Sequence, residues 1–285
     1  LLSSELATYV AGRYVEIKVN TLSFRECLSF KEARTGHAPE NVREELRSYI
    51  RLGGFPAVHT NDYSMDIAYR IVNDIYSSAI LRDIVQRHSI RNVELLERIV
   101  KFVFDNVGNT FSAKSVADYF KSERRKVDID TVYNYLSALE GAFIARKVPR
   151  YDLVGKAILQ TGEKYYLGDP SLSYAVMGYK DRMISGILEN IVMLEIERRE
   201  FKVSVGKANG KEVDFVAERK NEKVYIQVSY TPMSSQDSID GEFRPLLAIH
   251  DNYPKYVVTM DDFWSDNVEG VKHKHLADFL LMQEW

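Results

Sequence analysis

Two neighbouring segments near the end of the chain carry side chains that could do chemistry together. Residues 212–219 and 223–229 both read as strands, and Lys220-Asn221 between them suits a turn. Pairing them around that turn places Asp214 opposite Gln227 and Glu212 opposite Ser229. The other face of the hairpin then collects apolar residues: Val213, Phe215, Ala217, Val224, Ile226 and Val228. A slip of one residue would mix the two sets, so the pattern predicts one apolar face and one polar face.

Carboxylate oxygens are ligands for Mg²⁺, which stabilises the attacking and leaving oxygens of a phosphodiester. The hairpin and the helical segment before it resemble the PD-(D/E)XK nuclease fold. In that fold a helix Glu, a strand Asp and a Glu-x-Lys pair bind Mg²⁺ and activate water. By position, the resemblance implies that Glu189 is the helix acid and Asp214 the strand acid, which makes these two the expected metal ligands. Gln227 stands where the second acid would be, and Ser229 where the lysine would be.

These two replacements argue against cleavage, because Gln offers a metal one neutral oxygen and Ser cannot replace an ammonium group. Lys211 or Lys223 could reach the site from another strand position. Residues 183–285 hold 12 Lys and Arg against 18 Asp and Glu, a difference of −6, and an acidic domain repels DNA. We therefore expect a degenerate catalytic site at Glu189, Asp214 and Gln227. The alternative is that these residues form a polar surface facing solvent.

The region before residue 91 is predicted to be mostly helical. Residues 13–19 alternate like a half-buried strand, and Ser23 is suited to cap a helix that starts at Phe24. Residues 41–52 and 65–86 then repeat apolar side chains at a helical period, and Gly53-Gly54 ends the first of these two helices.

Residues 91–180 are predicted to contain three helices followed by two strand-like stretches, at 143–149 and 164–167. Ser112 caps the second helix, and the third starts near Asp128 and stops at Gly141. This order describes a winged helix-turn-helix. Residues 181–285 follow the order αβββαβ, which indicates an α/β layered domain.

The third helix of the middle unit turns polar side chains away from its apolar stripe, and an Asn there could read adenine. Residues 112–160 hold nine Lys and Arg against six Asp and Glu, a local balance of +3, which makes a mild basic patch. The candidate nucleic-acid-binding residues on and around this helix are Arg124, Arg125, Lys126, Thr131, Tyr133, Asn134, Arg146 and Lys147. DNA is the expected partner, and the alternative is a module used for packing or protein contacts.

A succession of short motifs runs through the whole chain. In order, they are Leu1-Leu2-Ser3-Ser4-Glu5, Ala11-Gly12-Arg13, Leu22-Ser23-Phe24, Gly53-Gly54-Phe55-Pro56, Arg82-Asp83-Ile84, Thr131-Val132-Tyr133-Asn134-Tyr135-Leu136, Lys164-Tyr165-Tyr166-Leu167-Gly168-Asp169, Lys211-Glu212-Val213-Asp214-Phe215-Val216, Ile226-Gln227-Val228 and Glu242-Phe243-Arg244-Pro245-Leu246-Leu247. Their order resembles a prokaryotic family of AAA+-like ATP-binding proteins. In that family the ATPase core is followed by a helical lid, a winged helix and a C-terminal domain of unknown function.

The resemblance implies a multidomain α/β fold with three parts. They are an ATPase-core remnant with a helical lid (1–90), a winged helix-turn-helix (91–180) and a C-terminal αβββαβ restriction-endonuclease-like domain (181–285). The chain lacks the G-x-x-x-x-G-K-[ST] loop that holds ATP phosphates. ATP and Mg²⁺ are therefore implied only for a full-length family member, and this chain alone is expected to need no cofactor beyond Mg²⁺ at the last domain.

Composition indicates an ordinary globular protein with 45% hydrophobic and 28% charged residues. Cys27 is the single cysteine, so no disulfide can form within the chain. No apolar run approaches the roughly 20 residues that span a bilayer. We expect a cytoplasmic protein with no membrane contact. His273 and His275 alternate on a strand-like stretch, but without an evident third metal ligand they are expected to be surface histidines.

Three functions follow as hypotheses. The first is a nucleic-acid- or partner-binding part of an AAA+-like ATPase with an inactive nuclease-like domain. The second is a Mg²⁺-dependent nuclease that uses Glu189 and Asp214. The third is a scaffold whose acidic last domain contacts another protein.

Overall fold

The computed structural model describes residues 17–285 except 89, 154, 156, 209, 231–234 and 263–266. Arg13 and most of the strand expected at 13–19 lie outside the described residues. None of the described helices is long and apolar enough to cross a membrane.

The first part of the described chain is helical, as predicted. Ser23 caps its first helix and exchanges hydrogen bonds with Glu26 in a capping box, and Asn41 caps the second. Gly53 ends that second helix. The elements are α2 (Phe24–Thr35), α3 (Val42–Leu52), α4 (Pro56–His59), α5 (Met65–Ile75), the π-helix η1 (Tyr76–Leu81) and α6 (Arg82–Arg87).

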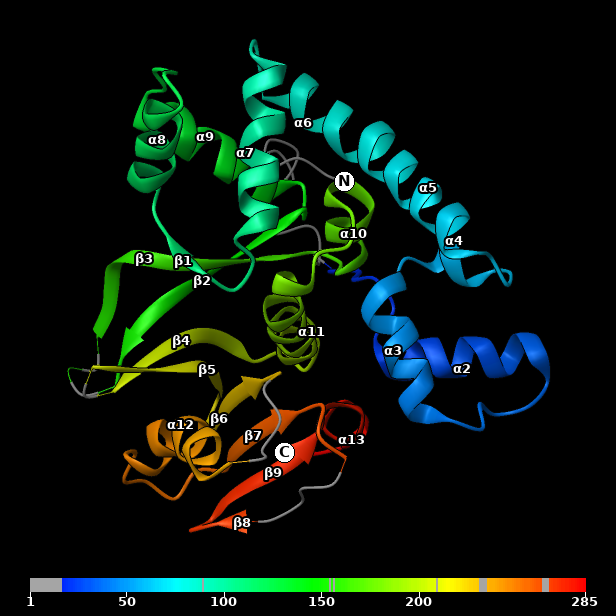
Figure 1. Ribbon diagram of the computed structural model, residues 1–285, viewed down its shortest axis with the longest axis vertical. Coiled ribbons are helices and arrows are strands. Elements are labelled where there is room, and N and C mark those ends of the chain that lie inside the picture. Colours follow the sequence, from blue (N-terminus) through cyan, green and yellow to red (C-terminus); the bar gives the residue numbers. More distant parts are fainter. Residues whose placement is uncertain are drawn as a thin grey trace.

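The middle part contains three helices and then an antiparallel pair of long strands (Figure 1). Ser112, the predicted cap of the second helix, and Asp128, near which the third helix was expected to start, both accept hydrogen bonds from the first turn of the helix they precede. The elements are α7 (Val93–Asp105), β1 (Thr110–Phe111), α8 (Ala113–Ser122), α9 (Ile129–Gly141), β2 (Ala145–Asp152), β3 (Ala157–Leu167) and α10 (Ser171–Met177).

The last part follows the predicted αβββαβ order and adds a short strand pair before its final helix. Its elements are the 3₁₀ helix η2 (Asp181–Met183), α11 (Ile184–Arg198), β4 (Lys202–Ala208), β5 (Lys211–Arg219), β6 (Glu222–Ser229), α12 (Gln236–Leu247), β7 (Lys255–Thr259), β8 (Asn267–Val268), β9 (Val271–His275) and α13 (Leu276–Leu281).

One sheet joins the middle and last parts of the chain. Its nine described strands follow the order β1-β3-β2-β4-β5-β6-β7-β9-β8. The junction is the parallel pairing of β2 with β4, in which Arg150 lies opposite Val205. The boundary expected at residue 180 therefore does not separate two sheets, and the fold class is mixed α/β with helices on both faces (Figure 1).

Between residues 215–219 and 222–226 the register of the central hairpin is the predicted one, but its two faces differ from the prediction. Phe215 lies opposite Ile226, as expected. However, the pairing of β5 with β4 shifts by one residue between Ser204 and Gly206, so β5 bulges. The bulge moves Val213 into the smaller core under α12, whereas Phe215 faces the main core. The prediction of one apolar face and one polar face was wrong, because both faces of the sheet are buried by helices.

The Gly53-Gly54 turn packs against a buried carboxylate from the middle part of the chain. Asp169 Oδ2 accepts a hydrogen bond from Gly54 N at 2.8 Å, and Leu22 N donates to Gly54 O at 2.7 Å. A Cβ atom on Gly54 would lie 2.0 Å from Leu22 O, and one on Gly53 would lie 1.8 Å from Asp169 Oδ1. The two glycines therefore allow three distant segments to meet.

We expect Gly54→Ala to lower the free energy of unfolding by roughly 2–4 kcal/mol, because the added methyl group must push the backbone at Leu22 away. Urea denaturation would measure the loss. Gly241→Ala is the control, since a Cβ there meets no atom within 4 Å. Equal stability of the two variants would contradict the close contact.

Candidate functional site

A buried lysine lies at the centre of the acidic residues that the sequence singled out. Lys164 Nζ lies 3.1 Å from Glu189 Oε2, 2.7 Å from Glu212 Oε1 and 3.4 Å from Asp214 Oδ1. Its side chain is only 4% exposed. The two expected metal ligands, Glu189 and Asp214, thus do come together, with an ammonium group between them.

Three elements position this lysine cluster (Lys164, Glu189, Glu212 and Asp214). Lys164 comes from β3, Glu189 from α11, and both other acids from β5. The neighbouring residue Asn190 donates from its side-chain amide to Leu167 O at 2.9 Å, which fixes α11 against β3. The cluster therefore depends on the packing of α11 against the sheet.

Hydrogen bonds hold both buried acids in place. Tyr166 Oη donates to Glu189 Oε2 at 2.8 Å, and Val228 N donates to Asp214 Oδ2 at 2.9 Å. Asp214 N in turn donates to Gln227 Oε1 at 3.2 Å, but the Gln227 side chain also bonds Glu242 of α12, on the side of the sheet opposite α11. The expectation that the Asp214 and Gln227 side chains share one polar face was therefore wrong. Because Asp214 is buried, the alternative of a polar face in solvent does not apply to it.

Burial and neighbouring charges both shift the pKa values of the cluster. Burial, followed by repulsion from Asp214, raises the pKa of Glu189 to about 8. Burial also raises the pKa of Asp214, although Lys164 opposes the change. Burial alone would lower the pKa of Lys164, but attraction to Asp214, Glu189 and Glu212 outweighs it and raises that pKa. Lys164 is therefore charged and Glu189 is mostly protonated near pH 7.

A fourth acid, Glu242, approaches the hairpin from the opposite face of the sheet. Burial raises the pKa of Glu242 on α12, while hydrogen bonds with Ser229 and Gln227 lower it. Glu242 was quoted from the sequence only as part of a motif. It makes the surroundings of Gln227 more acidic than the nuclease comparison implies.

The described residues contain no group of three or more His, Cys, Asp or Glu side chains that could hold a metal ion. His273 and His275 are buried, not on the surface as expected. His273 Nε2 lies 2.7 Å from Thr259 Oγ1, and His275 Nδ1 accepts from Ala277 N at 3.0 Å. Both histidines thus have structural partners.

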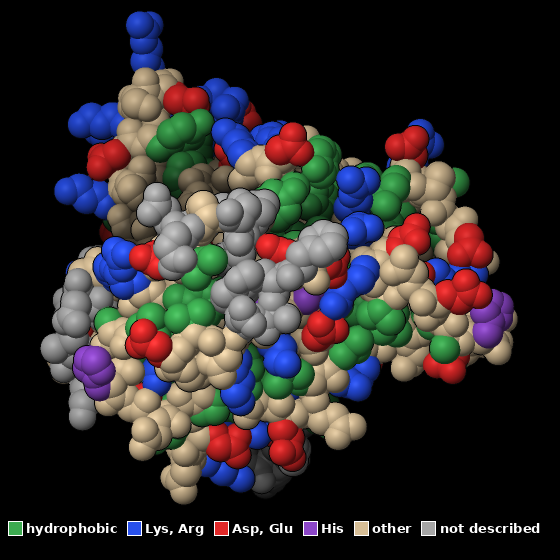
Figure 2. Space-filling model, turned by 60° about the horizontal axis from the view of Figure 1, so that its bottom comes forward, with side chains coloured by type: hydrophobic (Ala, Val, Ile, Leu, Met, Phe, Trp, Pro, Cys, Tyr) green, Lys and Arg blue, Asp and Glu red, His purple; other side chains and the backbone are tan. Residues whose placement is uncertain are grey.

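The candidate nucleic-acid-binding residues fall into two groups. Arg124, Lys126, Tyr133 and Asn134 are exposed on α9 and the turn before it, and Thr131 is half-buried beside them. Lys and Arg side chains are prominent on the upper left of Figure 2, the side on which Figure 1 shows α8 and α9.

The second group is held in ion pairs. Arg125 Nη1 lies 3.3 Å from Glu94 Oε1, and Lys147 Nζ lies 2.8 Å from Glu163 Oε1. The Arg146 side chain is 12% exposed and donates to Asn20 Oδ1 at 3.2 Å. The structure therefore does not bring Arg146 to the surface of α9.

Lys164 is the residue that the sequence reasoning missed. It was quoted within the motif at 164–169, but Lys211 and Lys223 were considered as the lysine of the site. Both lie elsewhere: Lys211 is exposed at the start of β5, and Lys223 pairs with Glu218. The available signal was a lysine directly before the apolar run Tyr165-Tyr166-Leu167 at the end of β3, where burial demands an acidic partner.

We expect the stability of the protein to fall as pH rises from about 5 to about 8. The raised pKa of Glu189 means that its contribution is complete below its ordinary pKa of 4.5 and is lost as pH rises through about 8. The slope can reach about 1.4 kcal/mol per pH unit for one proton. In Glu189→Gln the slope should flatten, as measured by urea denaturation at several pH values. The exposed Glu200→Gln should keep the wild-type slope, and an unchanged slope in Glu189→Gln would refute the assignment.

Comparison with known proteins gives a family. Residues 43–183 match the model of a domain of unknown function, DUF8612, so the match crosses the boundary expected at residue 90.

An uncharacterized protein of Haemophilus influenzae is 35% identical over 282 residues, which are 99% of this chain and 68% of the relative. An uncharacterized protein of Methanocaldococcus jannaschii is 26% identical over 297 residues, covering all of this chain and 66% of the relative. No solved structure matches the chain. The chain spans about two thirds of each relative, and it belongs to the family of the Haemophilus influenzae protein, with the DUF8612 domain at residues 43–183.

Proposed function

We propose that the chain is the nucleic-acid-binding part of an AAA+-like ATPase, and that its nuclease-like domain binds no metal and cleaves nothing. The middle part is taken as a winged helix whose third helix, α9, contacts DNA. The last part is taken as a PD-(D/E)XK-like domain. ATP, and the Mg²⁺ that goes with it, belong to the ATPase region of the longer relatives in this proposal.

The observation that carries the proposal is the pair of unpartnered cations beside α9. Neither Arg124 nor Lys126 has an acidic partner among the described residues, whereas Arg125 and Lys147 each have one. Tyr133 is 51% exposed on the adjoining helix and Asn134 is exposed next to it. The two cations suit contacts with DNA phosphates. The polar side chains of α9 beside them suit contacts with base edges.

The wing of the proposed winged helix consists of β2 and β3. In this proposal it does not bind DNA. β2 and β3 are interior strands of the nine-stranded sheet, and Lys164 of β3 is buried in the lysine cluster. Arg146 and Lys147 are engaged with Asn20 and Glu163. The wing therefore packs against the last domain, and binding to DNA rests on α9 and the turn before it.

The lysine cluster supports the absence of cleavage. The ammonium group of Lys164 lies between the carboxylates that would have to approach a Mg²⁺ ion, and like charges repel. The cluster then serves as a buried ion pair that fastens β3 to α11 and β5.

We expect duplex DNA to bind with a strong salt dependence between about 50 and about 200 mM salt. The double variant Arg124→Ala/Lys126→Ala should weaken binding at least about tenfold and reduce the slope of log K against log salt by about two, because two phosphate contacts are lost. Fluorescence anisotropy with a labelled duplex would measure both quantities.

Lys211→Ala/Lys272→Ala is the charge-matched control, because both lysines are exposed on the far part of the sheet. No binding by the wild-type chain at low salt would refute the nucleic-acid proposal and favour a protein scaffold. Equal losses in the two double variants would refute the assignment of the interface to α9.

We expect Mn²⁺ to leave the melting temperature of the wild-type chain unchanged but to raise that of Lys164→Ala, since removing the ammonium leaves three carboxyl groups uncompensated. Lys223→Ala is the matched control, because it removes a lysine from the ion pair with Glu218 in the same sheet. Metal-dependent cleavage of plasmid DNA by the wild-type chain, lost in Asp214→Ala, would show instead that the domain is an active nuclease.

A further inference from the structure

A polar cleft lies where the start of the described chain meets α11 and the C-terminal tail. Its volume is about 630 Å³, within the range of small-molecule sites. Residues 18–21, the first turn of α2, the last turn of α11 and residues 282–283 line it. The elements that line the cleft, α2, α11 and the tail after α13, lie away from α9 (Figure 1), so the cleft is separate from the proposed DNA-binding surface.

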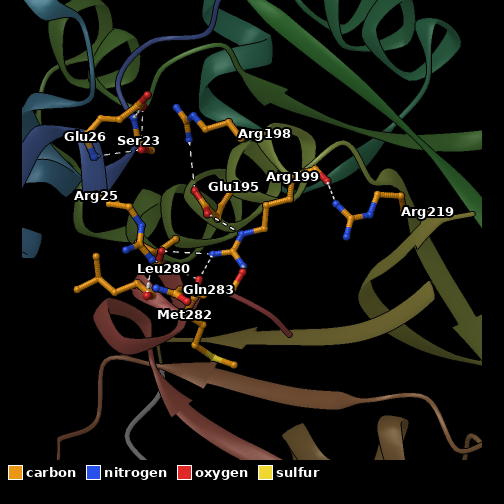
Figure 3. A network of polar contacts seen from close by, with 11 residues as sticks. Ser23, Arg25, Glu26, Glu195, Arg198, Arg199, Arg219, Leu280, Met282 and Gln283 are labelled. Carbon is orange, nitrogen blue, oxygen red and sulfur yellow. Dashed lines mark hydrogen bonds and ion pairs between the residues drawn. The ribbon is translucent and has the colours of Figure 1, made fainter.

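Four cationic side chains line this cleft: Lys18, Arg25, Arg198 and Arg199. Among the described residues that line the cleft, Glu26 and Glu195 are the only acids. Figure 3 shows Glu195 between Arg198 and Arg199, with Ser23, Arg25 and Glu26 across from them. If each of these groups carries its usual charge, the described lining has a net charge of +2.

Two of the arginines donate hydrogen bonds to uncharged backbone carbonyl oxygens. Arg199 Nη2 donates to Met282 O at 2.7 Å while its Nε donates to Glu195 Oε1 at 2.8 Å. Arg25 donates to the carbonyl of Leu281 and has no carboxylate partner among the described residues. Hydrogen bonds to carbonyl groups fix the position of a guanidinium without neutralising its charge.

Arg198 has a free donor inside the protein. Its Nη2 donates to Thr21 O at 2.9 Å, and its Nη1 is 4.0 Å from Glu195. Its Nε is buried and makes no hydrogen bond to any described residue. A buried donor without an acceptor costs free energy, and Arg198 itself lines the cleft.

The two acids of the cleft are already engaged. Ser23 N donates to Glu26 Oε2 at 2.7 Å, which keeps the Glu26 carboxylate at the start of α2. Burial raises the pKa of Glu26, but hydrogen bonds from Ser23 and the charge of Arg198 outweigh it, so its pKa lies below the ordinary value. Glu195 accepts from Arg199. These contacts hold the two carboxylates in place, and the Lys18 and Arg25 side chains make no ion pair with either of them.

We propose that this cleft binds a polyphosphate group. Several guanidinium donors and the net charge of +2 on the described lining fit a multivalent phosphate better than a single carboxylate, because phosphate oxygens accept hydrogen bonds from several forks at once. The group comes either from a free nucleotide or from a nucleic-acid backbone. Bound there, it bridges residues 18–21 to α11 and so fixes the start of the described chain against the last domain.

The test uses the whole chain and tripolyphosphate as the probe, measured by isothermal titration calorimetry at low salt. We expect saturable binding that weakens at least about tenfold in Lys18→Ala/Arg25→Ala. The Lys18 side chain is on the surface, so Lys18→Ala alone should fold and should weaken binding by a smaller factor. Lys211→Ala, which removes an exposed lysine outside the cleft, should bind as the wild type does.

ATP and a short single-stranded oligonucleotide distinguish the two sources. If ATP binds with the same dependence on Lys18 and Arg25, the cleft takes a nucleotide. If the oligonucleotide competes with tripolyphosphate and ATP does not, it takes a nucleic-acid backbone. The proposal fails if tripolyphosphate does not bind, or if it binds equally well to the wild type and to Lys18→Ala/Arg25→Ala. Failure of DNA binding at α9 would leave this result unaffected, because Arg124 and Lys126 do not line the cleft.

Discussion

The buried charge of Lys164 constrains the whole arrangement of the sheet and α11. Moving an ammonium group out of water costs several kcal/mol, and here three carboxyl groups from two other elements offset the cost. The cluster is stable only while β3, β5 and α11 are all in place. A hydrophobic side chain at residue 164 would not require this geometry, so the lysine specifies how the middle and last parts of the chain fit together.

The same constraint changes how the nuclease resemblance is understood. The positions that matched a metal site by sequence, Glu189 and Asp214, do lie together, but the cation near them belongs to the protein. A fixed ammonium group can balance charge, yet it has no open coordination position for water or phosphate. Such a cluster holds β3, β5 and α11 together, which is a structural role. The exposed polar groups on α9 and the cationic cleft are the surfaces that we propose for ligands.

Local signals in the sequence predicted local structure well. Ser23, Asn41, Ser112 and Asp128 each lie at a helix start, because a cap acts through hydrogen bonds to its own first turn. The hairpin register was also predictable, since a two-residue turn fixes which residues face each other. The bulge in β5 was not, because it depends on the partner strand β4. Lys164 was missed for the same reason: its acids are 25 to 50 residues away, and no periodicity links them. The link of Arg146 to Asn20 spans 126 residues and was equally invisible.

The parallel pairing of β2 with β4 has a consequence for how the chain folds. The hairpins β2–β3 and β5–β6 close over short loops, but Arg150 meets Val205 only after β3, α10 and α11 have been laid down between them. Bringing together residues far apart in sequence costs the chain more conformational entropy before any contact stabilises it. Such contacts therefore form late. Until β4 has been synthesised, one edge of β2 in the nascent chain has no neighbouring strand. Exposed strand edges of this kind invite pairing with other molecules, so completion of the last domain also protects the middle one from aggregation.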